Sequence, residues 1–156
     1  MKKFSLIISL LILITACKPE IKDIGTRYAP TDGIPGTWSI YKIEMIDQTV
    51  PVPETEDVTR AFEAMGNNLT LTIKEDGTYT VDETWYGPDF FGTSGTWMLN
   101  AEEYADSITF YTAEGDTSGM ALLNMVRAID PYFGVKAQRN KCDKNYAAYD
   151  LTFSRN

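Results

Sequence analysis

The sequence contains no histidine among its 156 residues and only two cysteines. Without an imidazole, a serine or cysteine nucleophile has no histidine base, and a zinc site has no histidine ligand. Basic residues are also few, since 14 lysines and arginines stand against 22 aspartates and glutamates and leave a net charge of −8. An acidic chain is a poor partner for nucleic acid. We therefore expect a protein that is not an enzyme, holds no cofactor or metal and binds no nucleic acid.

The first sixteen residues have the pattern of a secretory signal peptide. The basic start MKK precedes an apolar run over 4–14, which is too short for a membrane-spanning helix. The letters LITAC at 13–17 resemble the lipobox of bacterial lipoproteins. This resemblance implies cleavage before Cys17, a diacylglycerol on its sulfur and an acyl chain on its amine. The alternative is a soluble secreted protein that has a cysteine at this position by chance.

Residues 17–35 would connect the lipid to the folded domain. They mix proline, glycine, threonine and charged residues without a period, which is typical of a flexible tether. Two or more acyl chains hold a protein firmly at a membrane. Lys18 stands where an aspartate would indicate retention in the inner membrane, so we expect a lipid anchor in the outer membrane.

The second cysteine, Cys142, has no disulfide partner if Cys17 carries lipid. It lies between Lys141 and Asp143, and the chain offers it no histidine base. We therefore interpret Cys142 as a loop or half-buried thiol without a catalytic role.

Apolar and polar residues alternate over much of residues 36–156, which predicts β-strands joined by turns. In the run 37–46 the alternation slips by one residue between Ile40 and Ile43, which indicates a β-bulge. The pair Asp76-Gly77 joins two alternating runs and predicts a hairpin. The other alternating runs lie at 68–74, 78–86, 95–99, 107–112, 135–139 and 146–154.

One helix is predicted between the first two strands, at 54–68. Acidic residues occupy its first turn, Gly66 suits its C-terminal end, and four apolar residues share one helical face: Val58, Ala61, Phe62 and Met65. Residues 119–129 are apolar on both faces. We interpret them as a strand, with a helix as the alternative, and we expect Asp130-Pro131 and Gly134 to form the next turn.

Together these segments predict an all-β domain over 36–156, an eight-stranded antiparallel up-and-down barrel with one short helix after the first strand. The order of GTW at 36–38, KEDGTYTV at 74–81, SGTWML at 94–99 and YDLTFSR at 149–155 resembles the lipocalin-like lipoproteins of Gram-negative bacteria. The resemblance implies that Trp38 closes one end of the barrel and that Arg155 lies across its indole ring. For Trp97, in the second GTW, we expect the same structural role of an inward plug, with ligand stacking as the alternative.

Aromatic residues crowd the glycine-rich segment TWYGPDFFGTSG at 84–95. Clustered aromatic rings on a loop can bind an apolar molecule or a sugar ring. Aromatic residues at strand ends usually belong to the core, so we expect these rings to fold onto the end of the barrel. The alternative is a ligand-binding platform made of Trp85, Tyr86, Phe90 and Phe91, with the carboxylate of Glu83 beside it.

The expected function is that of a membrane-anchored lipocalin-like lipoprotein that binds a small apolar or amphipathic ligand or a glycan. The alternative is a structural or accessory subunit that meets a protein of an outer-membrane complex. An exposed apolar patch away from the ligand site would favour this second function.

Overall fold

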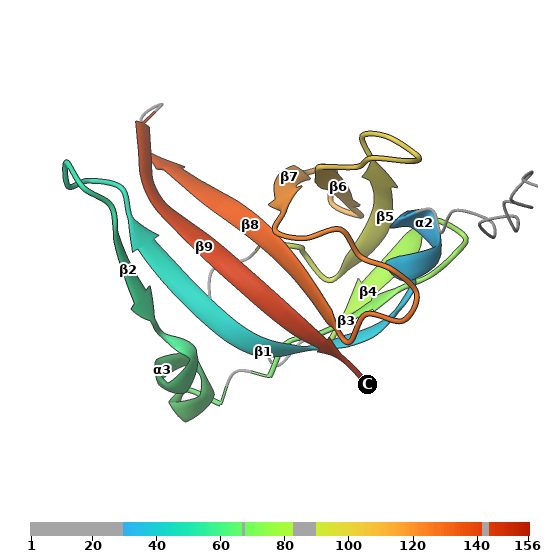
Figure 1. Cartoon of the computed structure of the whole chain (residues 1–156), viewed down its shortest axis with the longest axis horizontal. Coiled ribbons are helices and arrows are strands. Elements are labelled where there is room, and N and C mark those ends of the chain that lie inside the picture. The colour runs from blue at the N-terminus through green and yellow to red at the C-terminus, as the bar shows by residue number, and fades with distance from the viewer. Residues whose placement is uncertain (1–29, 67, 83–89, 142–143) are drawn as a thin grey trace, which may run out of the picture.

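The computed structural model describes residues 30–66, 68–82, 90–141 and 144–156. Over these residues the chain forms a closed eight-stranded antiparallel β-barrel with an extra strand, β2 (Glu54–Asp57), and two short helices, α2 (Pro30–Gly33) and α3 (Thr59–Ala64) (Figure 1). This confirms the predicted fold class. None of the described helices is long and apolar enough to cross a membrane. The barrel strands are β1 (Gly36–Asp47), β3 (Thr70–Ile73), β4 (Thr78–Val81), β5 (Ser94–Leu99), β6 (Ser107–Thr112), β7 (Thr117–Leu122), β8 (Tyr132–Lys141) and β9 (Lys144–Arg155).

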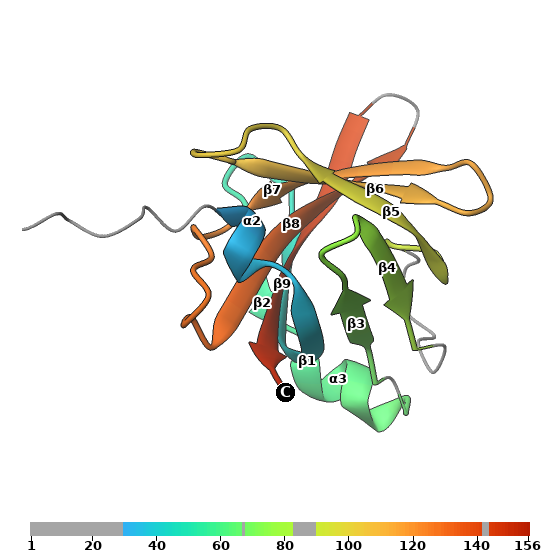
Figure 2. The ribbon, with the colours of Figure 1, turned by 90° about the vertical axis from the view of Figure 1, so that its right-hand side faces the viewer.

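Strand β1 closes the barrel. It pairs with β3 on one edge and with β9 on the other, and every strand from β3 to β9 pairs with its neighbour in sequence (Figure 2). The register with β9 changes between Ile40, opposite Phe153, and Lys42, opposite Thr152, so Tyr41 is the extra residue of a bulge. The predicted slip in this strand is thereby confirmed. A bulge bends its strand and increases the local twist.

The extra strand β2 pairs with the far half of β1, beyond the part that β3 covers. The sequence had predicted a helix for 54–57, and that prediction is wrong. The backbone of β1 from Glu44 to Asp47 would otherwise leave unpaired groups on this edge, and β2 supplies their partners in an antiparallel register. Three of the four residues of β2 carry a carboxylate, and this charge makes the sheet edge a poor template for aggregation.

Helix α3 follows the first strand, as predicted, but it covers only Thr59–Ala64. Val58 and Phe62 are half-buried and pack against the core, whereas Ala61 and Met65 are exposed. The predicted apolar face of this helix is therefore only partly buried. Gly66 has a φ of 77°, a left-handed conformation that suits a helix end, as expected.

Residues 119–129 divide into two parts. Residues 119–122 belong to strand β7, as the strand interpretation predicted, but 123–129 do not, because 123–131 form an irregular loop. Gly134 does not form a turn, because it lies inside β8 opposite Thr152. A Cβ atom at Gly134 would lie 3.0 Å from the Cβ of Leu123, so the glycine serves a close approach between the loop and the strand.

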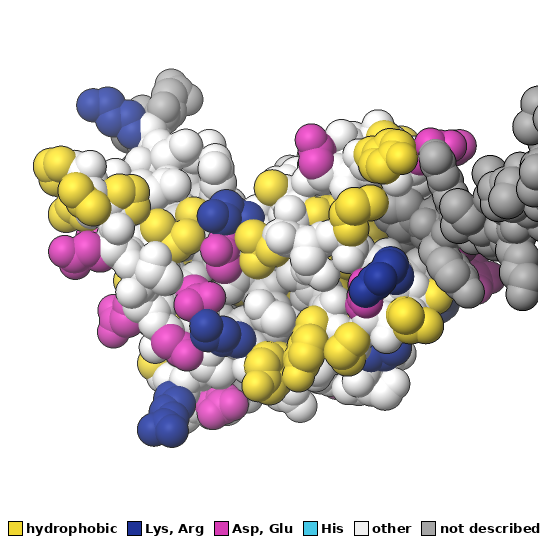
Figure 3. All heavy atoms as spheres, viewed as in Figure 1, with side chains coloured by type: hydrophobic (Ala, Val, Ile, Leu, Met, Phe, Trp, Pro, Cys, Tyr) yellow, Lys and Arg dark blue, Asp and Glu magenta, His cyan; other side chains and the backbone are white. Residues whose placement is uncertain are grey.

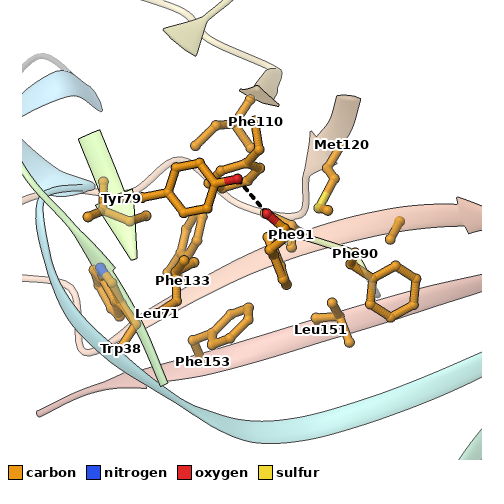
Figure 4. Packing of buried hydrophobic residues seen from close by; sticks show 14 of the residues in the cluster. Trp38, Leu71, Tyr79, Phe90, Phe91, Phe110, Met120, Phe133, Leu151 and Phe153 are labelled. Atoms are coloured by element: carbon orange, nitrogen blue, oxygen red, sulfur yellow. Dashed lines mark hydrogen bonds between the residues drawn. The ribbon is translucent and has the colours of Figure 1, made fainter. Parts of the chain in front are cut away.

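Aromatic rings fill the described part of the barrel interior (Figure 4). Tyr79 and Phe91 each make edge-to-face contact with Phe110, at centroid distances of 4.9 and 5.1 Å. Phe133 stacks on Phe153 at 5.9 Å. These pairs come from five different segments of the chain, so the packing of rings ties the sheet together across its curvature. The inward residues of the alternating runs are buried as predicted: Leu69, Leu71, Ile73, Ile108, Phe110, Val135, Ala137, Leu151 and Phe153.

Three connecting segments share the local motif Asp-x-Thr. In each, one aspartate oxygen accepts hydrogen bonds from both the backbone N–H and the hydroxyl of the threonine two residues later. These bonds to the hydroxyl and the N–H stabilise the ionised carboxylate, so they lower the pKa of Asp47, Asp57 and Asp76 below the ordinary value of 3.8. The motif fixes the loop after β1, the start of α3 and the β3–β4 turn.

Candidate functional site: a cleft beside Trp97

Two of the four rings considered as a binding platform on the loop 84–95, Phe90 and Phe91, are among the described residues. Both are buried in the hydrophobic core. The hydroxyl of Tyr79 donates to the carbonyl oxygen of Phe91 and so ties this segment to the interior (Figure 4). The ring of Phe90 packs against Tyr149 at 5.3 Å and under the guanidinium of Arg139 at 5.0 Å. For these two residues the structure has the expected arrangement, in which the rings pack into the barrel core.

Three other residues assigned to that platform, Glu83, Trp85 and Tyr86, lie outside the described residues. The same holds for Cys17 and Cys142.

The closed end of the barrel is built around Trp38, which is fully buried. Its indole N–H donates to the carbonyl of Ile34 at 2.8 Å, and the guanidinium carbon of Arg155 lies 4.3 Å from its ring centroid. Arg155 also donates to the carbonyls of Gly33 at 2.6 Å and Pro35 at 3.4 Å. The contact that the lipocalin-like resemblance implied is therefore present, and it binds the segment before β1 to the last residues of β9.

The glycines of the two GTW triplets serve different close approaches. A Cβ atom at Gly36 would lie 3.2 Å from Nη1 of Arg155, so this glycine leaves room for the guanidinium over Trp38. A Cβ atom at Gly95 would lie only 1.9 Å from the carbonyl oxygen of Tyr111 on β6. The first triplet thus accommodates a side chain, and the second accommodates a neighbouring strand.

Trp97 differs from Trp38 because it is only half-buried. It pairs with Phe110 in the β5–β6 register and packs against the core from one side. Its indole N–H donates to the carbonyl of Lys74 at 3.0 Å, so the ring is held in one orientation at the barrel rim. Trp97 is also one of the residues that line a cleft of about 860 Å³.

This cleft lies between α2, the β3–β4 turn and the segment that follows β5. Its described lining combines apolar groups beside the indole with three carboxylates, and it includes no lysine or arginine. The lining residues are Thr31, Asp32, Glu75, Gly77, Trp97, Met98, Leu99, Asn100, Ala101 and Glu102.

Asn100 lines the cleft, but its side-chain amide is hydrogen-bonded within the protein. Its side-chain oxygen accepts from the backbone N–H groups of Asp106 at 3.1 Å and Ser107 at 3.2 Å, and its amide nitrogen donates to the carboxylate of Asp106 at 2.7 Å. These bonds close the loop between β5 and β6. A ligand in the cleft would therefore meet the face of Trp97 together with the carboxylates of Asp32, Glu75 and Glu102.

A second cleft, of about 590 Å³, lies between β1 and α3. Two of its ionic groups, Lys42 and Asp57, already have partners within the protein. Lys42 pairs with Glu44 at 2.8 Å, and the carboxylate of Asp57 accepts from Thr59 at 2.6 Å. A hydrogen bond to Glu44 raises the pKa of Lys42 above 10.5. Because these groups are already paired, this cleft has less to offer a ligand than the one beside Trp97.

No group of three or more metal-ligating side chains occurs among the described residues. Trp97 was predicted to be an inward plug, and it does pack against the core, although it is only half-buried and the sequence did not predict the cleft beside it. Glu102 follows Trp97 closely in the sequence, but strand periodicity does not place its carboxylate beside the indole.

Comparisons with protein-family models, with curated protein sequences and with solved structures found no match to this chain.

Proposed function

We propose that this protein is a membrane-anchored lipocalin-like lipoprotein of the outer membrane and a non-catalytic binding module. Its ligand site is the cleft beside Trp97, and its ligand is a neutral or amine-bearing glycan. The observation that carries the proposal is the half-buried indole of Trp97, which lines an open acidic cleft and whose N–H donates to the backbone carbonyl of Lys74.

The chemistry of the cleft favours a sugar ring. An indole face packs against the apolar C–H face of a sugar, while carboxylate oxygens accept hydrogen bonds from its hydroxyl groups. Asp32, Glu75 and Glu102 supply these acceptors on the sides of the cleft. Because no described lining residue carries a positive charge, an anionic sugar would be repelled, and an ammonium group would be attracted both to the carboxylates and to the indole face.

The barrel interior is a weaker candidate for the ligand site. Tyr79, Phe91, Phe110, Phe133 and Phe153 occupy its described part and contact one another. A ligand could enter there only by displacing buried rings, which would cost several kcal/mol for each large side chain removed from the core. The external cleft requires no such rearrangement.

The test is a calorimetric titration of the full-length protein in detergent micelles with three sugars of equal length. These are chitotriose, which is neutral, its deacetylated amine form, and trigalacturonate, which is anionic. We expect binding of the first two and none of the third. Trp97→Leu should weaken binding about tenfold, because it removes a stacking partner worth about 1.4 kcal/mol.

Two matched variants sharpen this test. Tyr111→Leu removes an exposed aromatic ring from the outer face of β6 and should leave the affinity unchanged. Glu102→Gln should weaken binding of the amine form about twofold to fivefold and affect the neutral sugar less, as expected for one exposed charge. Absence of binding by all three sugars, or equal affinity of the wild type and Trp97→Leu, would refute the proposed site.

A further inference from the structure

Five large hydrophobic side chains are exposed along one side of the molecule, where the loop 123–131 meets β8 and β1. We call this set the apolar band; it consists of Tyr41, Leu123, Met125, Ile129 and Tyr132. Figure 3 shows hydrophobic side chains gathered over the region where Figure 1 places the start of β8 and the adjoining loop. Ile129 is 78% exposed and Tyr41 is 57% exposed. Contiguous exposed apolar surface of this kind marks an interaction site.

The loop that carries most of the band is tightly held by its surroundings. Val126, in the middle of the loop, is buried in the core. The backbone N–H of Leu123 donates to the carbonyl of Gly134 at 2.9 Å, and Arg127 forms an ion pair with Asp130 at 3.0 Å. The loop is therefore fixed with its apolar side chains outward. The pairing of Arg127 with Asp130 also leaves the loop without net charge.

The two tyrosines extend the band from the loop onto the barrel wall. Tyr41 is the extra residue of the bulge in β1, and its ring lies 5.3 Å from the ring of Tyr132. Both rings remain substantially exposed. Tyrosine and aliphatic side chains together are the composition found at membrane interfaces, where one end of the ring is apolar and the other is wet.

The chain enters the folded domain beside this band. Helix α2 packs so closely on the loop that a Cβ atom at Gly33 would lie 2.2 Å from the carbonyl oxygen of Val126. Pro30, the first described residue, is thirteen residues after Cys17. Thirteen residues span at most about 45 Å in any conformation. A lipid on Cys17 would therefore keep this end of the domain close to the bilayer.

We propose that the apolar band rests on the lipid bilayer into which Cys17 is anchored, with its apolar side chains inserted into the headgroup region. This inference rests on the lipid anchor of the proposed function. Because the chain is acidic overall, apolar burial rather than attraction to anionic lipids would hold the band, and a zwitterionic bilayer suffices. The contact would fix the orientation of the barrel relative to the membrane.

The test is spin labelling of the full-length lipidated chain in vesicles of phosphatidylcholine and phosphatidylethanolamine. In a Cys142→Ser background, a label is attached at Ile129→Cys or, as the matched control, at Val52→Cys. Val52 is 76% exposed in the connection between β1 and β2, at the far end of the molecule from α2 in Figure 1. We expect collisions with a water-soluble nickel complex to be about fivefold fewer at 129 than at 52.

The outcomes separate the anchor from the band. If mass measurement finds no lipid on Cys17 and the chain does not float with vesicles, the anchor fails and this inference fails with it. If the chain is lipidated and floats but both labels are equally accessible to the nickel complex, only the band contact is refuted. If the label at 129 is shielded through spin–spin contact between copies or by another protein, the band is a protein interface and the bilayer proposal is likewise wrong.

Discussion

The contact between Arg155 and Trp38 offers a quantitative prediction about the closed end of the barrel. Arg155→Ala removes a guanidinium 4.3 Å from the indole centroid and its hydrogen bonds to the carbonyls of Gly33 and Pro35. A cation–π contact contributes about 0.5–2 kcal/mol, and hydrogen bonds from a charged group about 1.5–3 kcal/mol. Since Arg155 is partly exposed, we expect the variant to lose about 3 kcal/mol of unfolding free energy in total.

Trp38→Phe leaves an aromatic ring but removes the indole N–H that donates to Ile34 and part of a fully buried ring. We expect it to cost about 2–3 kcal/mol. A phenyl ring is a weaker cation acceptor than an indole, so the double variant should be about 1 kcal/mol more stable than the sum of the two losses implies.

The assay is urea unfolding of the four proteins, followed by far-ultraviolet circular dichroism. A matched cycle combines Trp38→Phe with Arg127→Ala, because Arg127 pairs with Asp130 instead of Trp38, and we expect these two losses to add. A coupling below about 0.3 kcal/mol between Trp38 and Arg155 would refute the energetic role of the contact.

Two further predictions concern backbone packing and pH. Gly95→Ala should destabilise the barrel by more than about 2 kcal/mol, because its Cβ would lie 1.9 Å from a backbone oxygen of β6. The control is Gly119→Ala on the other side of β6, where the nearest atom to the added Cβ would be 4.0 Å away. In urea unfolding this control should be close to neutral. The folded-state pKa of Asp76 is lowered by Thr78, so the carboxylate stabilises the fold above pH 3.8 and this contribution disappears as pH falls through the lowered pKa. Asp76→Asn should therefore be less stable than the wild type at pH 7 and equally stable near about pH 2, and a pH-independent difference would contradict the linkage.

The alternation of apolar residues was sufficient to predict the barrel. Runs such as Leu69, Leu71 and Ile73 place one side of each strand inward, and a closed sheet is the arrangement that buries those sides without leaving edges. The bulge at Tyr41 could also be predicted from the sequence, because an extra residue shifts the period-two pattern by one position.

Other features depended on contacts between distant segments. Residues 54–57 carry a helix-like acidic pattern, but the unpaired edge of β1 makes them a strand. Gly134 was predicted in a turn because glycine favours turns. In the structure it lies in a strand and allows the loop at Leu123 to approach closely, which local sequence does not reveal. The position of Trp97 at the rim, instead of in the interior, depends on where α2 and the β3–β4 turn lie in space, and strand periodicity carries no information on that.

The most direct test of the binding site is a map of backbone amide shifts in the full-length protein as chitotriose and its deacetylated form are added. If the cleft beside Trp97 is the site, the largest shifts will fall on residues 97–102, with others at 75–77 and 31–32, and the signals of Phe110, Phe133 and Phe153 will stay in place. Shifts concentrated on those three interior residues, or no shifts with either sugar, would contradict the account.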